Sequence, residues 1–272
     1  MRNFLPGQIK LSIVIPCFNQ GAYLMEALQS VEQCAVPGIE TLIVNDGSTE
    51  EETCRLLKAL GEQGHHIIHQ TNRGLSTARN VGVQKAKGPY VLPLDADNKI
   101  RPNFVLKGVR ILDRHSRVGV VYGRRFLFGS NTGVLRVPRF DLARLLACNF
   151  IDACSLFRRS VWEECGGFDE TMRSGLEDWE FWIRVASRGW KFYRLDEVVF
   201  DYRVRPDSML SHLYRSGGFD QVREYIYQKH RQLVLDRSFE IGRLKTGTSA
   251  NLMEKTTEIL KRMFTLTAGK RP

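Results

Sequence analysis

A regular alternation of short β-branched runs and amphipathic stretches occupies the first third of the chain and limits the folds open to it. The runs have the length and composition of buried strands, and the stretches between them have apolar residues at helical spacing. The predicted strands cover residues 11–15, 41–44, 67–68 and 90–94, and the predicted helices cover 22–34, 50–60 and 75–87. Because the connections are short, this order favours a parallel, doubly wound sheet with helices packed on its faces.

Polar side chains follow three of these predicted strands: Asn19 after the first, Asp46 after the second, and Asp95 and Asp97 after the fourth. The carboxyl ends of parallel strands meet at one edge of a sheet, where ligands bind in this class of fold. If the backbone stays extended, Asp95 and Asp97 point to the same side. Two carboxylates at this edge of the sheet would suit a Mg²⁺ or Mn²⁺ ion that holds a diphosphate. A simple polar turn is the alternative, because Asp and Asn are common turn residues.

The sequence lacks the motifs of two common nucleotide-binding classes. No Gly-x-Gly-x-x-Gly follows the first predicted strand, which argues against a dinucleotide-dependent dehydrogenase. No Gly-x-x-x-x-Gly-Lys-Ser/Thr phosphate loop is present either. A nucleotide at this edge of the sheet must therefore be held in another way.

The second half of the chain has a less regular pattern. Residues 102–115 are predicted to be helical, 118–122 to form a strand, and 160–165 to form a short helix. Between 123 and 148 the periodicity is lost among Gly, Arg and Pro, and we interpret this segment as a long irregular insert, which in a compact domain is usually functional. Pro93 cannot donate to a strand ladder, so a local irregularity is expected near the acidic strand end.

A second pair of carboxylates, Glu177 and Asp178, opens a well-patterned helix. Trp179 lies on its apolar face, which is predicted to be buried, and Glu180 is predicted to form an exposed pair with Arg184. Two interpretations of the carboxylate pair remain open. Acidic residues stabilise a helix N-terminus by about 0.3–1 kcal/mol through the dipole, which lowers their pKa. The second interpretation is that the pair provides a general base, which would be a carboxylate close to a sugar hydroxyl. Burial beside a second carboxylate would raise the pKa of such a base.

Composition places the chain among ordinary globular proteins, with 43% hydrophobic and 26% charged residues. No apolar run reaches the roughly 18 residues of a membrane span, and the first residues lack the apolar core of a signal peptide. The six cysteines form no Cys-x-x-Cys pair, which favours reduced thiols over disulfides or a zinc site. The protein is therefore expected to be cytoplasmic.

Much of the net charge of +10 lies from residue 213 onward, where 12 Lys and Arg face 6 Asp and Glu. Residues 213–235 and 252–264 of this region are predicted to be helical. A basic region of this kind can pack on the rest of the protein, form the interface of a homo-oligomer, or contact anionic lipid at the inner face of the cell membrane, and these alternatives stay open. Nucleic acid is not an expected partner, because no basic stripe with interleaved aromatics is present.

Six short motifs occur in an order and spacing that resemble the family 2 glycosyltransferases. They are Pro16-x-Phe18-Asn19, Val44-Asn45-Asp46-Gly47-Ser48-Thr49, Asn72-Arg73-Gly74 with Ala78-Arg79-Asn80-x-Gly82, Leu94-Asp95-Ala96-Asp97, Gly166-Gly167-Phe168-Asp169, and Glu177-Asp178. The resemblance covers about residues 9–212 and implies the α/β fold called GT-A, a Rossmann-like, doubly wound mixed sheet flanked by helices. It divides the chain into a GT-A domain at 1–212 (nucleotide-binding half about 9–98, acceptor half about 99–212) and a basic helical C-terminal extension at 213–272.

The resemblance also implies how the donor would be bound. The residues implied to hold the nucleotide are Pro16, Phe18, Asn19, Asp46, Arg79, Asp95 and Arg205. Asp46 would accept from the base, and Asp95 would contact the ribose. Many family members have a histidine near the position of Arg205, so this chain departs from the pattern there, and Arg205 would pair with phosphate oxygens.

The metal and catalytic roles follow from the same resemblance. Asp97 would hold a Mn²⁺ or Mg²⁺ ion, with Asp95 beside it. His212 would be either a further ligand of that ion or an exposed surface histidine. Asp178 would be the catalytic base, and Glu177 would lie beside it on the donor or acceptor sugar.

These features predict an enzyme that moves a hexosyl or N-acetylhexosaminyl group from a nucleotide diphosphate sugar, UDP-linked in most of the family, to an acceptor hydroxyl with inversion. The resemblance implies an acceptor in a glycan or lipid-linked saccharide of the cell envelope, and the segment 123–150 is expected to determine it. One alternative is a non-catalytic nucleotide-sugar binder or assembly subunit, which the intact Asp97 and Asp178 disfavour. The other is a nucleotidyltransferase of similar fold, which the loop after the first strand disfavours, because it is not Gly-rich.

Overall fold

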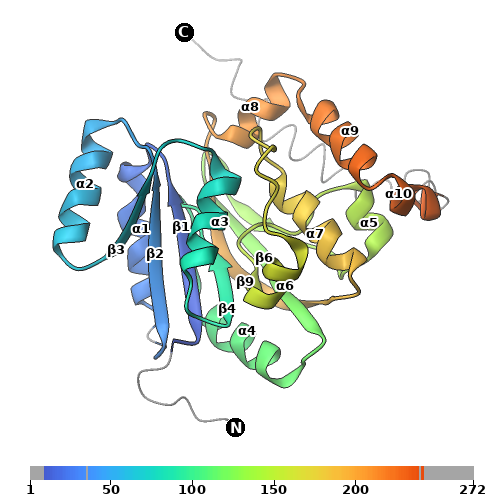
Figure 1. The fold of residues 1–272 in the computed structure, drawn as a ribbon, viewed down its shortest axis with the longest axis horizontal. Helices are drawn as coiled ribbons and strands as arrows, with labels where there is room; N and C mark the ends of the chain where they lie inside the picture. The colour runs from blue at the N-terminus through green and yellow to red at the C-terminus, as the bar shows by residue number, and fades with distance from the viewer. Residues whose placement is uncertain (1–8, 35, 239, 242–272) are drawn as a thin grey trace.

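A computed structural model describes residues 9–34, 36–238, 240 and 241 of the protein. Within these residues one mixed sheet is flanked by helices (Figure 1). Its strands are β1 (Leu11–Cys17), β2 (Ile39–Asp46), β3 (His66–Gln70), β4 (Tyr90–Pro93), β5 (Lys99–Ile100), β6 (Val118–Gly129), β7 (Gly133–Leu135), β8 (Leu156–Arg158) and β9 (Lys191–Val204). The helices are α1 (Gly21–Glu32), α2 (Glu51–Glu62), α3 (Leu75–Lys85), α4 (Pro102–Arg114), α5 (Leu142–Ala147), α6 (Arg159–Cys165), α7 (Glu177–Ser187), α8 (Met209–Arg215), α9 (Phe219–Lys229) and α10 (Arg231–Asp236).

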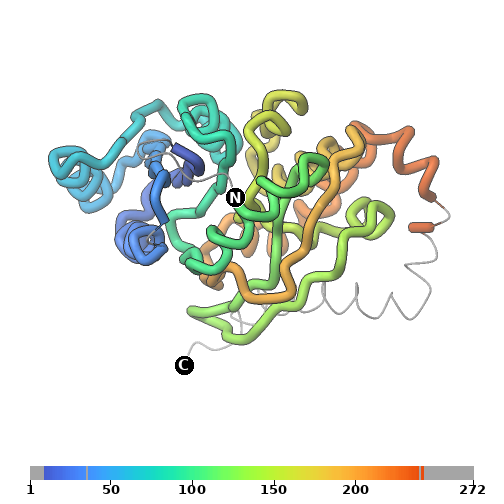
Figure 2. Tube along the Cα trace, turned by 90° about the horizontal axis from the view of Figure 1, so that it is seen from below, coloured from blue at the N-terminus to red at the C-terminus, as the bar shows by residue number. Residues whose placement is uncertain are grey.

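The strand order is β3-β2-β1-β4-β8-β6-β9-β5, with β7 paired to β6. The first four strands in this order are parallel, as the alternating pattern predicted. β8 is antiparallel to both β4 and β6, whereas β6 and β9 are parallel. Figure 2 shows the result as two regions side by side, the blue-to-teal N-terminal region and the green-to-orange C-terminal region. The combination of parallel and antiparallel strand pairs confirms the predicted mixed sheet.

Two hydrophobic clusters cover the two faces of the sheet. Alternate residues of β1 belong to different clusters: Val14 packs with α3, α6 and α7, and Ile13 and Ile15 pack with α1, α2 and α4. Figure 1 shows α3, α6 and α7 together on one face of the sheet. Trp179 and Trp182 of α7 are fully buried in the first cluster, as the helical pattern predicted. This packing fixes the N-terminal end of α7 close to the end of β4.

The interpretation of 123–148 as an irregular insert is wrong. β6 continues without a break to Gly129 and pairs in parallel with β9, and β7 and α5 follow it. Register shifts between 118 and 120 and on both sides of 124 interrupt the alternation of side chains along β6. Because a strand is recognised in a sequence by that alternation, a strand with bulges and polar residues is hidden until its long-range partner is known.

The expected extended backbone between Asp95 and Asp97 is also wrong. β4 ends at Pro93, which keeps regular register with Val14. The irregularity follows it, as a turn in which the Asn98 amide donates to the Asp95 carbonyl at 2.9 Å. The two carboxylates thus lie on a turn, which reorients them relative to a strand.

The predicted exposed pair of Glu180 and Arg184 is buried instead. Glu180 has no exposed surface, and besides Arg184 it binds Lys229 at 3.1 Å and His230 at 3.0 Å. The helical pattern could not show this, because Lys229 and His230 lie at the junction of α9 and α10. These contacts anchor the C-terminal helices to α7.

The predicted helix over 213–235 is present as α8, α9 and α10, and α8 spans the expected domain boundary at 212. The predicted helix over 252–264 lies outside the described residues. None of the helices within the described ranges is long and apolar enough to cross a bilayer. The domain boundary, the cellular location and any membrane contact of the basic region remain predictions.

Gly82 of α3 permits the close approach of this helix to the sheet. A Cβ atom at Gly82 would lie 2.2 Å from Val14 Cγ1, whereas one at Gly61 of α2 would meet only Ile67 at 3.7 Å. We therefore expect Gly82→Ala to lower the free energy of unfolding by about 1–3 kcal/mol. The matched change Gly61→Ala should raise it by roughly 0.5–1 kcal/mol, because glycine is unfavourable in a helix. Urea unfolding of both variants measures this, and equal effects would contradict the close packing of α3.

Candidate active site

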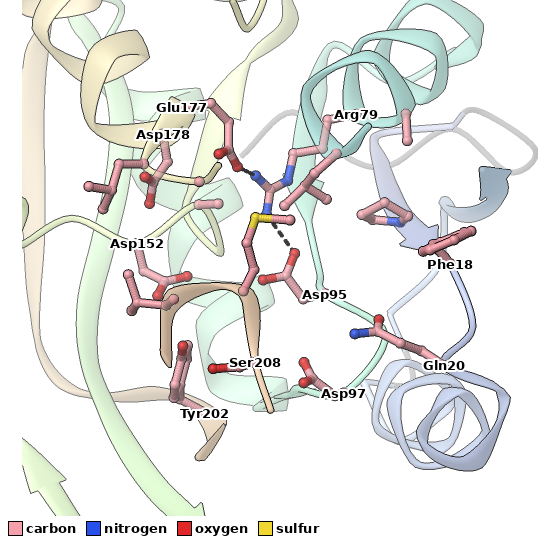
Figure 3. A pocket seen from close by; sticks show the side chains of 18 of the residues that line it. Phe18, Gln20, Arg79, Asp95, Asp97, Asp152, Glu177, Asp178, Tyr202 and Ser208 are labelled. Carbon is pink, nitrogen blue, oxygen red and sulfur yellow. Dashed lines mark hydrogen bonds and ion pairs between the residues drawn. The ribbon is translucent and has the colours of Figure 1, made fainter. Parts of the chain in front are cut away.

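A pocket of about 450 Å³ opens at the carboxyl ends of β1, β2 and β4 (Figure 3). Its walls come from these strand ends, from α3 and α7, and from the segment that joins β9 to α8. Nine of the residues singled out in the sequence line it: Pro16, Phe18, Asp46, Arg79, Asp95, Asp97, Glu177, Asp178 and Arg205. The fold thus brings both carboxylate pairs, which are far apart in the sequence, to one cavity.

Arg79 lies at the centre of this arrangement. Its side chain is only 2% exposed, and its guanidinium donates to Asp95 Oδ1 at 2.6 Å and to Glu177 Oε1. Burial opposes the charge on Arg79, but the carboxylates of Asp95 and Glu177 outweigh it and raise the pKa of the guanidinium. Arg79 therefore stays charged and ties the turn after β4 to the first turn of α7.

Asp97 lies on the same turn and is paired with a second arginine. Arg205 Nε donates to Asp97 Oδ2 at 2.9 Å, and Arg203 Nε donates to the Asp97 backbone carbonyl at 3.1 Å. Burial and the nearby charge of Asp95 raise the pKa of Asp97 to about 6, although Arg205 acts in the opposite direction. Asp95 and Asp97 consequently face one pocket, each held by its own guanidinium.

The opposite end of the pocket is formed by the loops after β1 and β2. Phe18 is 43% exposed and lines the pocket there. Asp46 is buried, and its carboxylate accepts from the backbone amides of Arg73 at 2.8 Å and Gly74 at 2.9 Å, and from Gln70. Asp46 thereby fixes the loop that leads into α3 and gives this end of the pocket a defined shape.

Two residues predicted for the site lie elsewhere. Asn19 does not line the pocket, and its Oδ1 accepts from the amides of Thr49 and Glu50. These two bonds hold the residues just before α2, which begins at Glu51. His212 of α8 is exposed and is also absent from the pocket walls. The structure thus gives Asn19 a place in the loop packing and does not place His212 among the residues that line the pocket.

Asp178 and Glu177 occupy the first turn of α7, after Leu176 in a left-handed conformation (φ 64°). Asp178 Oδ1 accepts from its neighbouring amide at 2.7 Å and from Asn149 Nδ2 at 3.0 Å. Burial first, and then the charges of Glu177 and Asp152, raise the pKa of Asp178 to about 8. The sequence left open whether the pKa of Asp178 is raised or lowered, and in the folded protein burial raises it.

Several residues of the pocket were missed in the sequence. Arg125 comes from the region interpreted as irregular, Asn149 and Asp152 lie just after it, and Asp152 is paired with Arg125 at 3.0 Å. Arg173 also lines the pocket. Each of the other arginines in the pocket wall forms an ion pair, whereas Arg173 forms none with the described residues. None of these residues lies in a recognisable motif. The position of Arg125 follows from the pairing of β6 with β8 and β9, which sequence patterns do not show.

The acidic turn has the donor set of a small hard cation. Mg²⁺ and Mn²⁺ are typically held by one or two carboxylates and complete their shell with phosphate oxygens and water. Asp95 and Asp97 provide two carboxylates, and each has only one of its oxygens bound by an arginine side chain. The part of the chain that the structure describes contains no group of three or more His, Cys, Asp or Glu that could hold a metal alone. The residues therefore fit an ion shared with a phosphorylated ligand.

The chain belongs to the glycosyl transferase family 2, whose family model matches residues 12–168. Among curated proteins, an uncharacterized glycosyltransferase of Rickettsia bellii is 29% identical in an alignment of 204 residues that covers 70% of this chain and 28% of that protein. The chain thus spans less than a third of the length of this relative.

Solved structures show the same fold. A fragment of S. aureus TarS in complex with UDP-GlcNAc matches with a TM-score of 0.61 at 20% identity, over 76% of this chain and 64% of that one. The mannosyltransferase PcManGT from Pyrobaculum calidifontis, in complex with GDP-Man and Mn²⁺, matches with a TM-score of 0.60 at 19% identity, over 77% and 61%. The GT-A fold predicted from the sequence is confirmed.

The raised pKa of Asp178 makes a prediction about stability. The folded protein holds the Asp178 proton up to about pH 8, whereas an unfolded aspartate releases it near pH 4, so the wild type loses stability as pH rises between these values. Asp178→Asn removes this loss. Its melting temperature relative to the wild type should therefore increase from about pH 4 to about pH 8. In the exposed control Asp220→Asn, which is 76% exposed, the difference should stay flat. If the melting-temperature difference from the wild type depended on pH in the same way in both variants, the raised pKa of Asp178 would be contradicted.

Proposed function

We propose that the protein transfers a sugar from a nucleotide diphosphate sugar to an acceptor hydroxyl, with inversion. The observation that best supports this is the meeting of Asp97 and Asp178 in one pocket, on either side of the Arg79–Asp95 pair (Figure 3). Family membership supports the transferase class. The complexes of TarS with UDP-GlcNAc and of PcManGT with GDP-Man support a nucleotide sugar as donor.

In this proposal the nucleotide occupies the end of the pocket formed by the loops after β1 and β2. The base packs on Phe18, and Asp46 either accepts from it directly or fixes the loop beneath it. The diphosphate lies at the acidic turn, where Arg205 and Arg203 are within reach of phosphate oxygens and a guanidinium can bind them bidentately. Arg173, at the rim near Gly74, supplies a further positive charge. We propose UDP as the nucleotide, because most of the family uses it.

Asp178 is proposed as the general base. Its carboxyl lies on the side of the pocket opposite Phe18, where it can take the proton from an acceptor hydroxyl as that oxygen attacks the anomeric carbon (Figure 3). A carboxylate whose pKa lies near the working pH suits this role, since the base must accept the proton and later release it. Attack from this side, with the diphosphate leaving toward the acidic turn, inverts the configuration.

Asp97 and Asp95 are the residues proposed to hold Mn²⁺ or Mg²⁺. Such an ion would offset the negative charge that the leaving diphosphate gains. PcManGT, which was solved with Mn²⁺, supports this choice. The transferred group is proposed to be a hexosyl or N-acetylhexosaminyl unit, and the acceptor a glycan or a lipid-linked saccharide.

The donor proposal predicts nucleotide binding that depends on Asp97. Calorimetric titration with UDP, GDP and dTDP, in Mn²⁺ and then in EDTA, should show binding of one nucleotide. Binding should weaken by at least about tenfold, or about 1.4 kcal/mol, in EDTA and in Asp97→Asn, because the charge on the diphosphate is then less well neutralised.

A matched control is Asp201→Asn, which removes a carboxylate that pairs with Arg101 at 2.8 Å on β9, away from the pocket walls. This variant should bind the nucleotide as the wild type does. If a folded wild-type protein bound none of the three nucleotides, or if Asp97→Asn bound them unchanged, the proposed donor site would be wrong.

A further inference from the structure

The wall of the pocket next to Asp178 contains hydrogen-bond acceptors that have no partner among the described residues. Asn149 donates to Asp178 through Nδ2, and its own Oδ1 is buried without a hydrogen-bond partner among the described residues. Glu177 is only 3% exposed, and its Oε2 is likewise without a partner there. Buried polar atoms in a folded protein are normally paired, so unpaired acceptors in a pocket wall indicate a ligand that donates.

Asp152 adds a charged acceptor to this wall. Arg125 donates to Asp152 Oδ2 at 3.0 Å, and the Cys154 amide donates to Asp152 Oδ1 at 2.9 Å. Arg125 in turn packs over the ring of Tyr202, 5.5 Å from its centroid. The carboxylate is thus held by two donors. A carboxylate oxygen can accept more than one hydrogen bond, so Asp152 keeps accepting capacity toward the pocket.

The position of this wall separates it from the nucleotide end. Figure 3 shows Asp152 and Asp178 on the side opposite Phe18, with Asp95 between the two sides. Asn149 is bonded directly to Asp178, so a sugar whose hydroxyl reaches Asp178 also brings its neighbouring hydroxyls to Asn149 and Asp152. An anionic sugar would place its carboxylate against acceptor oxygens of Asp152 and Glu177, and two negatively charged groups at close range repel each other.

We propose that Asn149 and the Arg125-held Asp152 are specificity-determining residues that bind the acceptor sugar, by accepting hydrogen bonds from hydroxyls adjacent to the one that attacks. The acceptor is accordingly a sugar that is uncharged at this face and presents at least two neighbouring hydroxyls. This inference rests on the proposed function and extends it to the acceptor class. Asp178 removes the proton, and Asn149 and Asp152 orient the ring.

The experiment measures sugar binding by saturation-transfer NMR on the full chain saturated with UDP, or with whichever nucleotide binds. The sugars are methyl β-D-glucopyranoside, methyl β-D-galactopyranoside, methyl α-D-mannopyranoside, their 2-acetamido analogues, and the charged methyl β-D-glucuronide. At least one uncharged glycoside should bind, and the glucuronide should bind more weakly than the glucoside. In Asp152→Asn the affinity of that glycoside should fall by about tenfold, while nucleotide affinity stays within about twofold.

Deoxy analogues of the bound glycoside sharpen the test. Removing a hydroxyl that donates to Asp152 should weaken binding to the wild type and have little further effect in Asp152→Asn, because the two changes remove the same hydrogen bond. If Asp152→Asn does not fold, Asn149→Ala is measured in the same way, with the loss expected at a different hydroxyl. Asp201→Asn serves as the matched ion-pair control and should bind the sugar as the wild type does.

The outcomes distinguish this inference from the function on which it rests. Unchanged glycoside affinity in both pocket variants would overturn it, and so would the failure of every uncharged glycoside to bind to protein that binds a nucleotide. In either case the donor site would stand. Failure to bind any nucleotide would overturn the proposed function itself, and this inference with it.

Discussion

The buried guanidinium of Arg79, paired with both Asp95 and Glu177, is the interaction on which the arrangement of the pocket depends. It joins three segments that the chain order keeps apart: α3, the turn after β4, and the first turn of α7. Leaving a charge of this kind buried without its partner typically costs about 3–5 kcal/mol, so the three segments are held to one geometry. The close packing of Gly82 on Val14 places α3, and with it Arg79, at this depth.

The two ends of the pocket differ in their charged and hydrogen-bonding groups, and each end suits a different ligand. Toward the acidic turn, carboxylates alternate with arginines, so that end can accept both a cation and phosphate oxygens. Toward Asp178 the unpaired side-chain atoms of Asn149 and Glu177 are acceptors, and the arginine there, Arg125, is paired with Asp152. A nucleotide diphosphate and a hydroxyl-rich sugar have these complementary properties. Burial at this second end also raises the pKa of Asp178.

The sequence predicts the part of the molecule whose structure is decided locally. β1, β2, β4 and the helices between them follow from hydrophobic periodicity, and the residues at their ends reach the pocket as expected, apart from Asn19. What could not be predicted depends on long-range partners. β6 is hidden by its bulges, Glu180 is buried only because α9 and α10 cover it, and Asp152 gains its position from Arg125 on a neighbouring strand. His212 lies near the pocket segment in sequence, but its position on α8 turns it to the surface.

The central claim is that one pocket, organised by Arg79, places the donor diphosphate at the acidic turn and leaves the Asp178 side for the acceptor. A crystal structure of the protein with UDP and Mn²⁺ tests this most directly. The account predicts the base beside Phe18, the diphosphate and the metal at Asp97, and no part of the nucleotide against Asp152. A nucleotide whose diphosphate lies against Asp152 and Asp178, or one bound outside this pocket, would contradict it.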